Sequence, residues 1–226
     1  MSKFKSLMLS IVLMLIAVVF APVVMAAVEN NANTAVYRVT FVPTFTLASH
    51  PYRWQKSLHF TPWIIGSYKK GYDMYKVGTK ATRGLKLMAE KGKISTLRRE
   101  MLIAKRNGLV YSIASYNSNS YDEVVNSTIK MSKDFPLVAA TTMIGPSPDW
   151  FVGVSDVKLY HKNGGWVPSK TVIAYAYDSG TDAGADYRSK NKVEKPVKDV
   201  ELLRTKYFLH NGKLNPVATV IFTRLG

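Results

Sequence analysis

Short stretches of alternating hydrophobic and polar residues recur along the chain and predict β-strands. In residues 35–45, Tyr37 and Val39 fall on one side, while Arg38 and Thr40 fall on the other. Successive side chains of a strand point to opposite faces, so this pattern predicts a strand with one buried face. Further strands are expected at residues 109–115, 137–144, 150–159, 171–177, 201–210 and 217–224.

The number and spacing of these strands predict the fold class. Turn-forming residues separate them, and the Asn-Gly-Gly sequence within residues 161–165 supplies the positive φ angles that a tight hairpin requires. Many short strands separated by turns are typical of an antiparallel sandwich. We therefore predict an all-β fold, an antiparallel β-sandwich with one or two short helices inserted.

Two segments show the helical spacing of hydrophobic residues instead. Residues 79–91 and 95–107 each place apolar side chains on one face, and Gly92 and Gly108 follow as helix stops. Lysines and arginines occupy the outer faces of both segments. A basic face on an amphipathic helix is usually solvated, so we do not expect either helix to be a membrane helix.

Two longer stretches show neither the alternation typical of strands nor the spacing typical of helices. Residues 46–75 are interrupted by Pro51, Pro62 and Gly66, and they are rich in aromatic residues. This composition predicts a long loop that packs on the core. Residues 116–134 are polar, and we expect them to be partly irregular.

The beginning of the chain has the pattern of a secretory signal peptide. Lys3 and Lys5 precede an almost wholly apolar stretch at residues 7–24, and the small residue Ala26 ends it. An uncleaved membrane anchor is the alternative, because the apolar stretch is about long enough to span a bilayer. We expect cleavage, because polar residues follow at once, and hence secretion to the periplasm or the outside. The predicted organisation is a signal peptide at 1–26, a flexible leader at 27–35 and one domain at 36–226.

The chain contains no cysteine. A secreted chain of this size without disulfides must rest on its hydrophobic core, on a metal ion, or on both. Hydrophobic residues make up 47% of the chain, which is enough for a substantial core. Because animal extracellular proteins usually carry disulfides, this composition favours a bacterial periplasmic or exported protein.

Positive charge is concentrated in one part of the chain. The formal net charge is +16, and residues 53–106 alone hold 14 Lys and Arg against the three acids Asp73, Glu90 and Glu100. Such a surface attracts anionic partners, among them acidic polysaccharide and anionic lipid, including by peripheral membrane contact. The alternative is a solubility feature with no ligand. Secretion argues against nucleic acid as the partner.

Two of the scarce acidic residues lie close together directly after a predicted strand. Asp178 and Asp182 are four positions apart in the run Tyr-Asp-Ser-Gly-Thr-Asp-Ala-Gly of residues 177–184. Calcium prefers oxygen ligands from carboxylates and carbonyls, and a glycine-containing loop can curl around the ion. The same residues are also ordinary turn formers, so the run taken alone favours a turn over a calcium loop.

A second motif, together with this run, resembles a known family. Residues 145–150 (Gly-Pro-Ser-Pro-Asp-Trp) are followed by an apolar strand, and residues 177–184 follow later in the chain. Both motifs resemble those of the spondin domain, the amino-terminal module of F-spondin and mindin. The resemblance covers residues 36–224, and we identify the chain as a single-domain member. It lacks the cysteines of the animal members and any following thrombospondin-type repeat. The resemblance therefore does not extend to the binding partners of the animal members.

The resemblance implies a fold, a cofactor and a function. The family is similar in fold to the calcium-dependent lipid-binding sandwiches, which have two packed sheets with loops gathered at one end. Its calcium ligands correspond here to Asp149, Asp178 and Asp182. The implied function is a secreted calcium-binding adhesion or recognition module, with an anionic surface, a glycan or an extracellular protein as partner.

The sequence offers little to suggest catalysis. None of its four histidines lies in a helical zinc motif, and no Gly-x-Ser-x-Gly elbow or phosphate-binding loop is present. We therefore expect no enzymatic activity. Two alternatives to the calcium module remain open, a charge-driven binder of anionic envelope surfaces or polysaccharide and a hydrolase with an unrecognised site.

Overall fold

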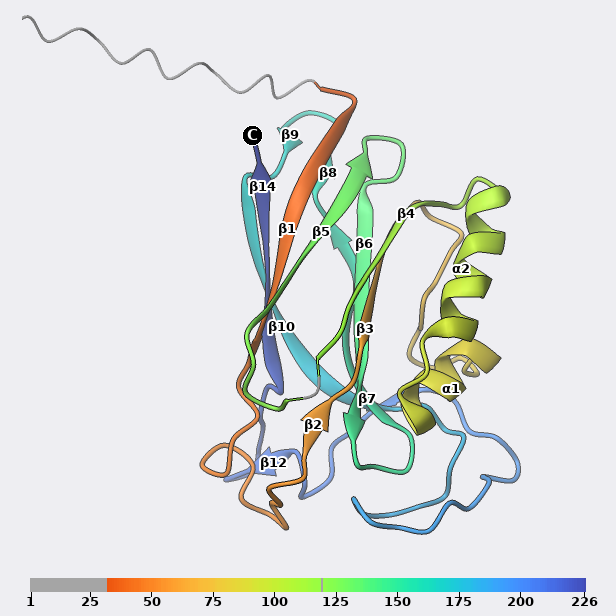
Figure 1. The fold of residues 1–226 in the computed structure, drawn as a ribbon, viewed down its shortest axis with the longest axis vertical. Helices are drawn as coiled ribbons and strands as arrows, with labels where there is room; N and C mark the ends of the chain where they lie inside the picture. The colour runs from red at the N-terminus through yellow and green to blue at the C-terminus, as the bar shows by residue number, and fades with distance from the viewer. Residues whose placement is uncertain (1–31, 119) are drawn as a thin grey trace, which may run out of the picture.

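The computed structural model describes residues 32–118 and 120–226. The predicted signal peptide and most of the predicted leader lie outside this part of the chain. Figure 1 shows an elongated β structure with two helices along one side. Its elements are β1 (Thr34–Pro43), β2 (His59–Phe60), β3 (Trp63–Tyr68), α1 (Arg83–Lys91), α2 (Ser95–Arg106), β4 (Val110–Tyr116), β5 (Val125–Ser132), β6 (Leu137–Gly145), β7 (Trp150–Lys158), β8 (Tyr160–His161), β9 (Gly165–Trp166), β10 (Ser169–Asp178), β11 (Glu201–Leu202), β12 (Leu209–His210), β13 (Lys213–Leu214) and β14 (Ala218–Leu225).

The prediction of an antiparallel all-β fold with two short inserted helices is confirmed. Every strand pairing is antiparallel, and the main sheet has the order β4-β3-β6-β7-β10-β14-β1-β5. The predicted hairpin is also present, because β8 pairs with β9 across it. The two helices begin and end within a few residues of the predicted bounds.

The main sheet folds over on itself at β10, so its two halves are joined rather than separate. Residues 169–174 of β10 pair with β14, whereas residues 175–178 pair with β7. One layer therefore contains β5, β1, β14 and the first half of β10, and the other contains the second half with β7, β6, β3 and β4. At the far side, the hydroxyl of Ser67 on β3 donates to the carbonyl of Lys130 on β5 at 2.7 Å, so the sheet is nearly closed.

The main core fills the space between the two layers. Strand β1 alternates as the sequence predicted, and its inward residues Tyr37 and Val39 are fully buried. The hydroxyl of Tyr37 donates to the carbonyl of Val167 at 2.6 Å, which satisfies its polar group inside the core. Side chains from the opposite layer, among them Ile65 and Val152, belong to the same cluster.

The second layer is buried on both faces, because the helices cover its outer side. Every residue of β3 is buried: Ile65 faces the main core, while Ile64 belongs to a second cluster with Leu97 and Met101 of α2. Strand β3 replaces part of the loop predicted at 46–75. A Cβ atom at Gly66 would meet the terminal methyl of Met101, so a larger residue here would force that side chain of α2 to move.

The two helices are linked through one carboxylate. Glu100 on α2 accepts hydrogen bonds from the Gly84 amide and the Thr82 hydroxyl, both at 2.7 Å. Thr82 is the N-cap of α1, so Glu100 supports the start of that helix and turns its charge inward. Neither helix in residues 32–118 and 120–226 has the length and apolarity needed to cross a bilayer.

A tyrosine fixes an irregularity in the second layer. The register between β6 and β7 shifts, and Asp156 of β7 adopts a positive φ of 53° there. The buried hydroxyl of Tyr68 accepts from the Asp156 amide at 2.8 Å and donates to Asp156 Oδ1 at 3.0 Å. This pair of bonds holds a backbone conformation that a residue other than glycine rarely adopts.

We expect Tyr68→Phe to lower the free energy of unfolding by about 0.5–1.5 kcal/mol, because it removes the hydroxyl to which the Asp156 amide and carboxylate are hydrogen-bonded. Urea denaturation followed by circular dichroism measures this difference. Tyr116→Phe, at an exposed position at the end of β4, serves as the matched control. Equal stability of the Tyr68 variant and the control would contradict this role.

Candidate functional site

The register between β7 and β10 brings two of the predicted aspartates to one end of the second layer. Asp178, the last residue of β10, pairs with Trp150, the first residue of β7. Asp149 immediately precedes Trp150 and therefore lies beside Asp178. The start of one strand meets the end of its antiparallel neighbour, as the sequence analysis expected.

Asp149 is fully buried, and its two carboxylate oxygens have different surroundings. Oδ2 accepts from the Thr181 amide at 2.7 Å, the Ser179 hydroxyl at 2.9 Å and the Asp182 amide at 3.1 Å. Oδ1 has no hydrogen-bond partner among the described residues. The carboxylate thus anchors the loop after β10 with one oxygen and keeps the other available for a cation or a proton.

Asp178 is half-buried and faces this charge. Its Oδ1 accepts from the Gly180 amide at 2.7 Å. Burial, followed by the neighbouring charge of Asp149, raises the pKa of Asp178 to about 7, although the Gly180 hydrogen bond opposes the rise. Glu201, its cross-strand neighbour on β11, adds a further negative charge. The two aspartates therefore repel each other when both are ionised.

Asp182 is buried nearby, but its carboxylate serves the loop itself. Oδ1 accepts from the Gly184 amide at 2.8 Å, and Oδ2 accepts from the Lys192 amide at 3.1 Å. These bonds close the segment between residues 182 and 192. Within the described part of the chain, no three His, Asp or Glu side chains converge into a ready-made metal-binding group. The structure thus brings Asp149 and Asp178 together. It places Asp182 nearby, where its carboxylate bonds to amides of its own loop.

The sequence analysis did not single out Glu90, which reaches the site from α1. Its Oε1 accepts from the Thr181 hydroxyl at 2.8 Å, and the same hydroxyl lies 3.3 Å from Asp149 Oδ2. Lys86 lies one turn earlier on the helix, and its Nζ is 3.4 Å from Glu90 Oε1. Glu90 is one of only three acids in the basic stretch of residues 53–106. This scarcity is the one feature of the sequence that could have indicated a role for Glu90.

The loop that carries the site is packed against the following segment. Gly180 has a positive φ of 74°, and a Cβ atom there would collide with the Lys198 carbonyl. The Lys198 amide also donates to the Gly180 carbonyl at 2.9 Å. Only glycine satisfies both conditions at this position, so Gly180 sets the distance between the aspartate loop and its neighbour.

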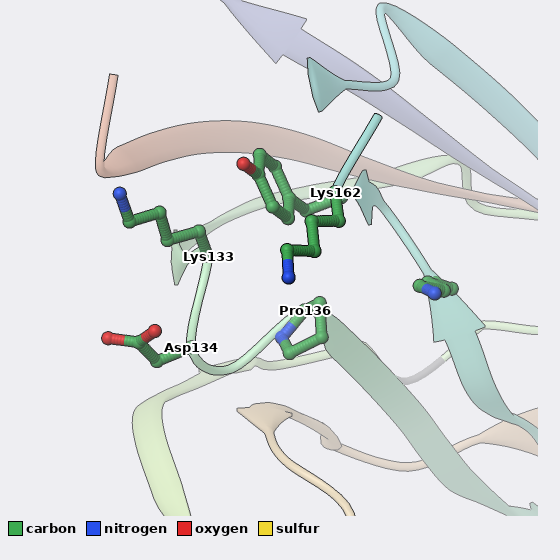
Figure 2. A pocket seen from close by; sticks show the side chains of 6 residues that line it. Lys133, Asp134, Pro136 and Lys162 are labelled. Atoms are coloured by element: carbon green, nitrogen blue, oxygen red, sulfur yellow. The ribbon is translucent and has the colours of Figure 1, made fainter. Parts of the chain in front are cut away.

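A cavity lies away from the aspartates, at the opposite end of β6. It has a volume of about 360 Å³ and is formed around the turn that precedes β6 (Figure 2). Asp149 follows the far end of the same strand, so the two places are separated by the length of β6. The cavity is lined by Lys133, Asp134, Pro136, Lys158, Tyr160 and Lys162.

Comparisons with known proteins agree with the motifs. The family model described as Spondin_N matches residues 35–214. Spondin-1 of Rattus norvegicus is 30% identical over 208 residues, which cover 85% of this chain and 26% of that protein. Spondin-1 of Homo sapiens is 28% identical over the same length, and Spondin-2 of Homo sapiens is 25% identical over 207 residues, or 62% of that protein. The chain spans about a quarter of the length of the Spondin-1 proteins.

The raised pKa of Asp178 predicts how stability depends on pH when a chelator is present. The folded protein holds the Asp178 proton up to about pH 7, whereas the unfolded chain releases it near the ordinary aspartate pKa of 3.8. The folded state therefore binds more protons in this range, so its stability should fall as the pH rises from about 4 to about 7.

Asp178→Asn should remove this component of the pH dependence, because the neutral amide does not titrate. Urea unfolding across the same pH range, in chelator, measures it. Asp134→Asn makes the same charge change at an exposed turn and should leave the pH dependence as it is in the wild type. An identical pH dependence in the Asp178 variant and the wild type would refute the assignment.

Proposed function

Because the chain belongs to the Spondin_N family, we propose that it is a secreted recognition module, without catalytic activity, whose loop end is organised by a calcium ion. Asp149 and Asp178 would hold the ion, and Asp182 would contribute from the edge of the site. The observation that carries the proposal is a pair of adjacent carboxylates: Asp149 is fully buried with an unpaired oxygen, and Asp178 is half-buried beside it.

The residues present fit a hard divalent cation. Calcium takes about six to eight oxygen ligands, and two to three carboxylates together with carbonyls and water commonly supply them. Asp149 Oδ1 is unpaired, and the repulsion that raises the pKa of Asp178 would be relieved by a cation between the two groups. The oxygens of Asp182 accept amide bonds but retain further lone pairs.

Recognition follows from where these residues lie. The loops that Asp149 anchors connect strands at one end of the molecule, and connecting loops on a rigid scaffold commonly carry binding functions. An ion that fixes these loops would lower the entropy lost when a partner binds. We propose an extracellular protein or a glycan as that partner. The activities of the much longer Spondin-1 proteins are not carried over to this chain.

The surroundings of one histidine support the non-catalytic assignment. His50 is buried against the rings of Phe45 and Phe208, and its Nδ1 lies 2.9 Å from the Ser49 hydroxyl. Burial lowers the pKa of His50 to about 4. The imidazole is therefore neutral at physiological pH and is packed as a core residue.

Isothermal titration calorimetry with calcium tests the proposal. The wild type should bind the ion, and Asp178→Asn should abolish measurable binding, because it removes one of two adjacent carboxylates. Asp134→Asn, with the same change in charge, should bind as the wild type does. Absence of calcium binding in the wild type, or unchanged affinity in Asp178→Asn, would refute the site.

Thermal unfolding provides a second measurement. Calcium at about a hundred times its dissociation constant should raise the unfolding free energy of the wild type by about 2.7 kcal/mol, and it should not change that of Asp178→Asn. In chelator, the Asp178 variant should be at least as stable as the wild type, because the repulsion with Asp149 is gone. A less stable variant in chelator would show that the carboxylate serves the fold.

A further inference from the structure

Four cations and two aliphatic residues share the exposed side of α2, which we call the α2 outer face. The helix turns Leu97, Met101 and Ala104 toward the sheet, and Figure 1 shows the helix standing on the outside of the molecule. The opposite side is free of the described chain. The residues of the α2 outer face are Arg98, Arg99, Leu102, Ile103, Lys105 and Arg106.

The cations of this face are not neutralised within residues 32–118 and 120–226, where none of the four forms an ion pair. The one acid of the helix, Glu100, points away from the face and bonds to the start of α1. All the charges on the α2 outer face are therefore positive, and they would attract an anionic partner.

The aliphatic residues decide which anionic partner fits. Leu102 is 40% exposed and Ile103 is 49% exposed. Leu102 lies one turn after Arg98 and one turn before Arg106, and Ile103 lies one turn after Arg99. Apolar side chains set between cations fit the boundary between lipid headgroups and acyl chains. A polysaccharide offers anionic groups but no apolar layer for these two residues to enter.

We propose that the α2 outer face docks the protein on an anionic lipid membrane, with α2 lying in the plane of the interface. The arginines and Lys105 contact the lipid phosphates, while Leu102 and Ile103 enter the acyl boundary. The sequence analysis expected a merely solvated basic face, but the exposed Leu102 and Ile103 distinguish this one. The contact is peripheral, because only one face of a short helix takes part. This proposal goes beyond the calcium site and does not depend on it, since Asp149 and Asp178 contribute nothing to the α2 outer face.

Vesicle sedimentation of the protein without the predicted signal peptide, residues 27–226, in chelator and low salt tests the proposal. The wild type should bind vesicles made of equal parts phosphatidylglycerol and phosphatidylcholine, and it should not bind phosphatidylcholine vesicles. The double variant Arg98→Gln/Arg99→Gln should lower the partition coefficient roughly 25-fold, since each cation near an anionic surface contributes about fivefold. Lys133→Gln/Lys162→Gln, at the cavity of Figure 2, makes the same charge change and should leave binding unaltered.

The double variant Leu102→Ser/Ile103→Ser separates lipid from other anionic partners, because it keeps every charge. It should lower vesicle binding about tenfold, whereas Val124→Ser, at an exposed aliphatic residue in the loop before β5, should not. Unchanged vesicle binding in the serine pair would overturn the proposal. Binding to dextran sulfate without binding to the anionic vesicles would also overturn it, in favour of a polysaccharide partner.

Discussion

The pairing of β10 with two different strands is the constraint on which the rest of the structure depends. Its first half belongs to one layer, and its second half belongs to the other. This change of partner closes the core around Tyr37 and its neighbours, and it fixes the register that sets Asp178 beside Trp150. The core and the aspartate pair are therefore consequences of the same strand path.

Sequence patterns predicted those elements that have one solvent-exposed face and one buried face. Strand β1 alternates because only its inner side chains are buried, and the helices show apolar stripes for the same reason. Strand β3 was missed because both of its faces are covered, which removes the alternation, and because Gly66 was taken for a loop residue. Strand β5 was missed because five of its eight residues are polar.

The candidate site was predictable in part. The motifs around Asp149 and Asp178, combined with antiparallel pairing, were enough to bring these two residues together. The periodicity of the chain carries no information on which amides a carboxylate accepts, so the bonds of Asp182 to Gly184 and Lys192 required the structure. The contribution of Glu90 depends on how α1 packs against the sheet, and that packing follows from tertiary contacts alone.

Strands β3 and β4 are paired neighbours, and both helices lie in the connection between them. In topological terms, the helical segment is an elaborated hairpin turn. The outward side of α2 takes no part in the pairing of β3 with β4, so substitutions there leave the strand pairings unchanged. The surface chemistry of this connection can therefore change independently of the strand ends that carry Asp149 and Asp178.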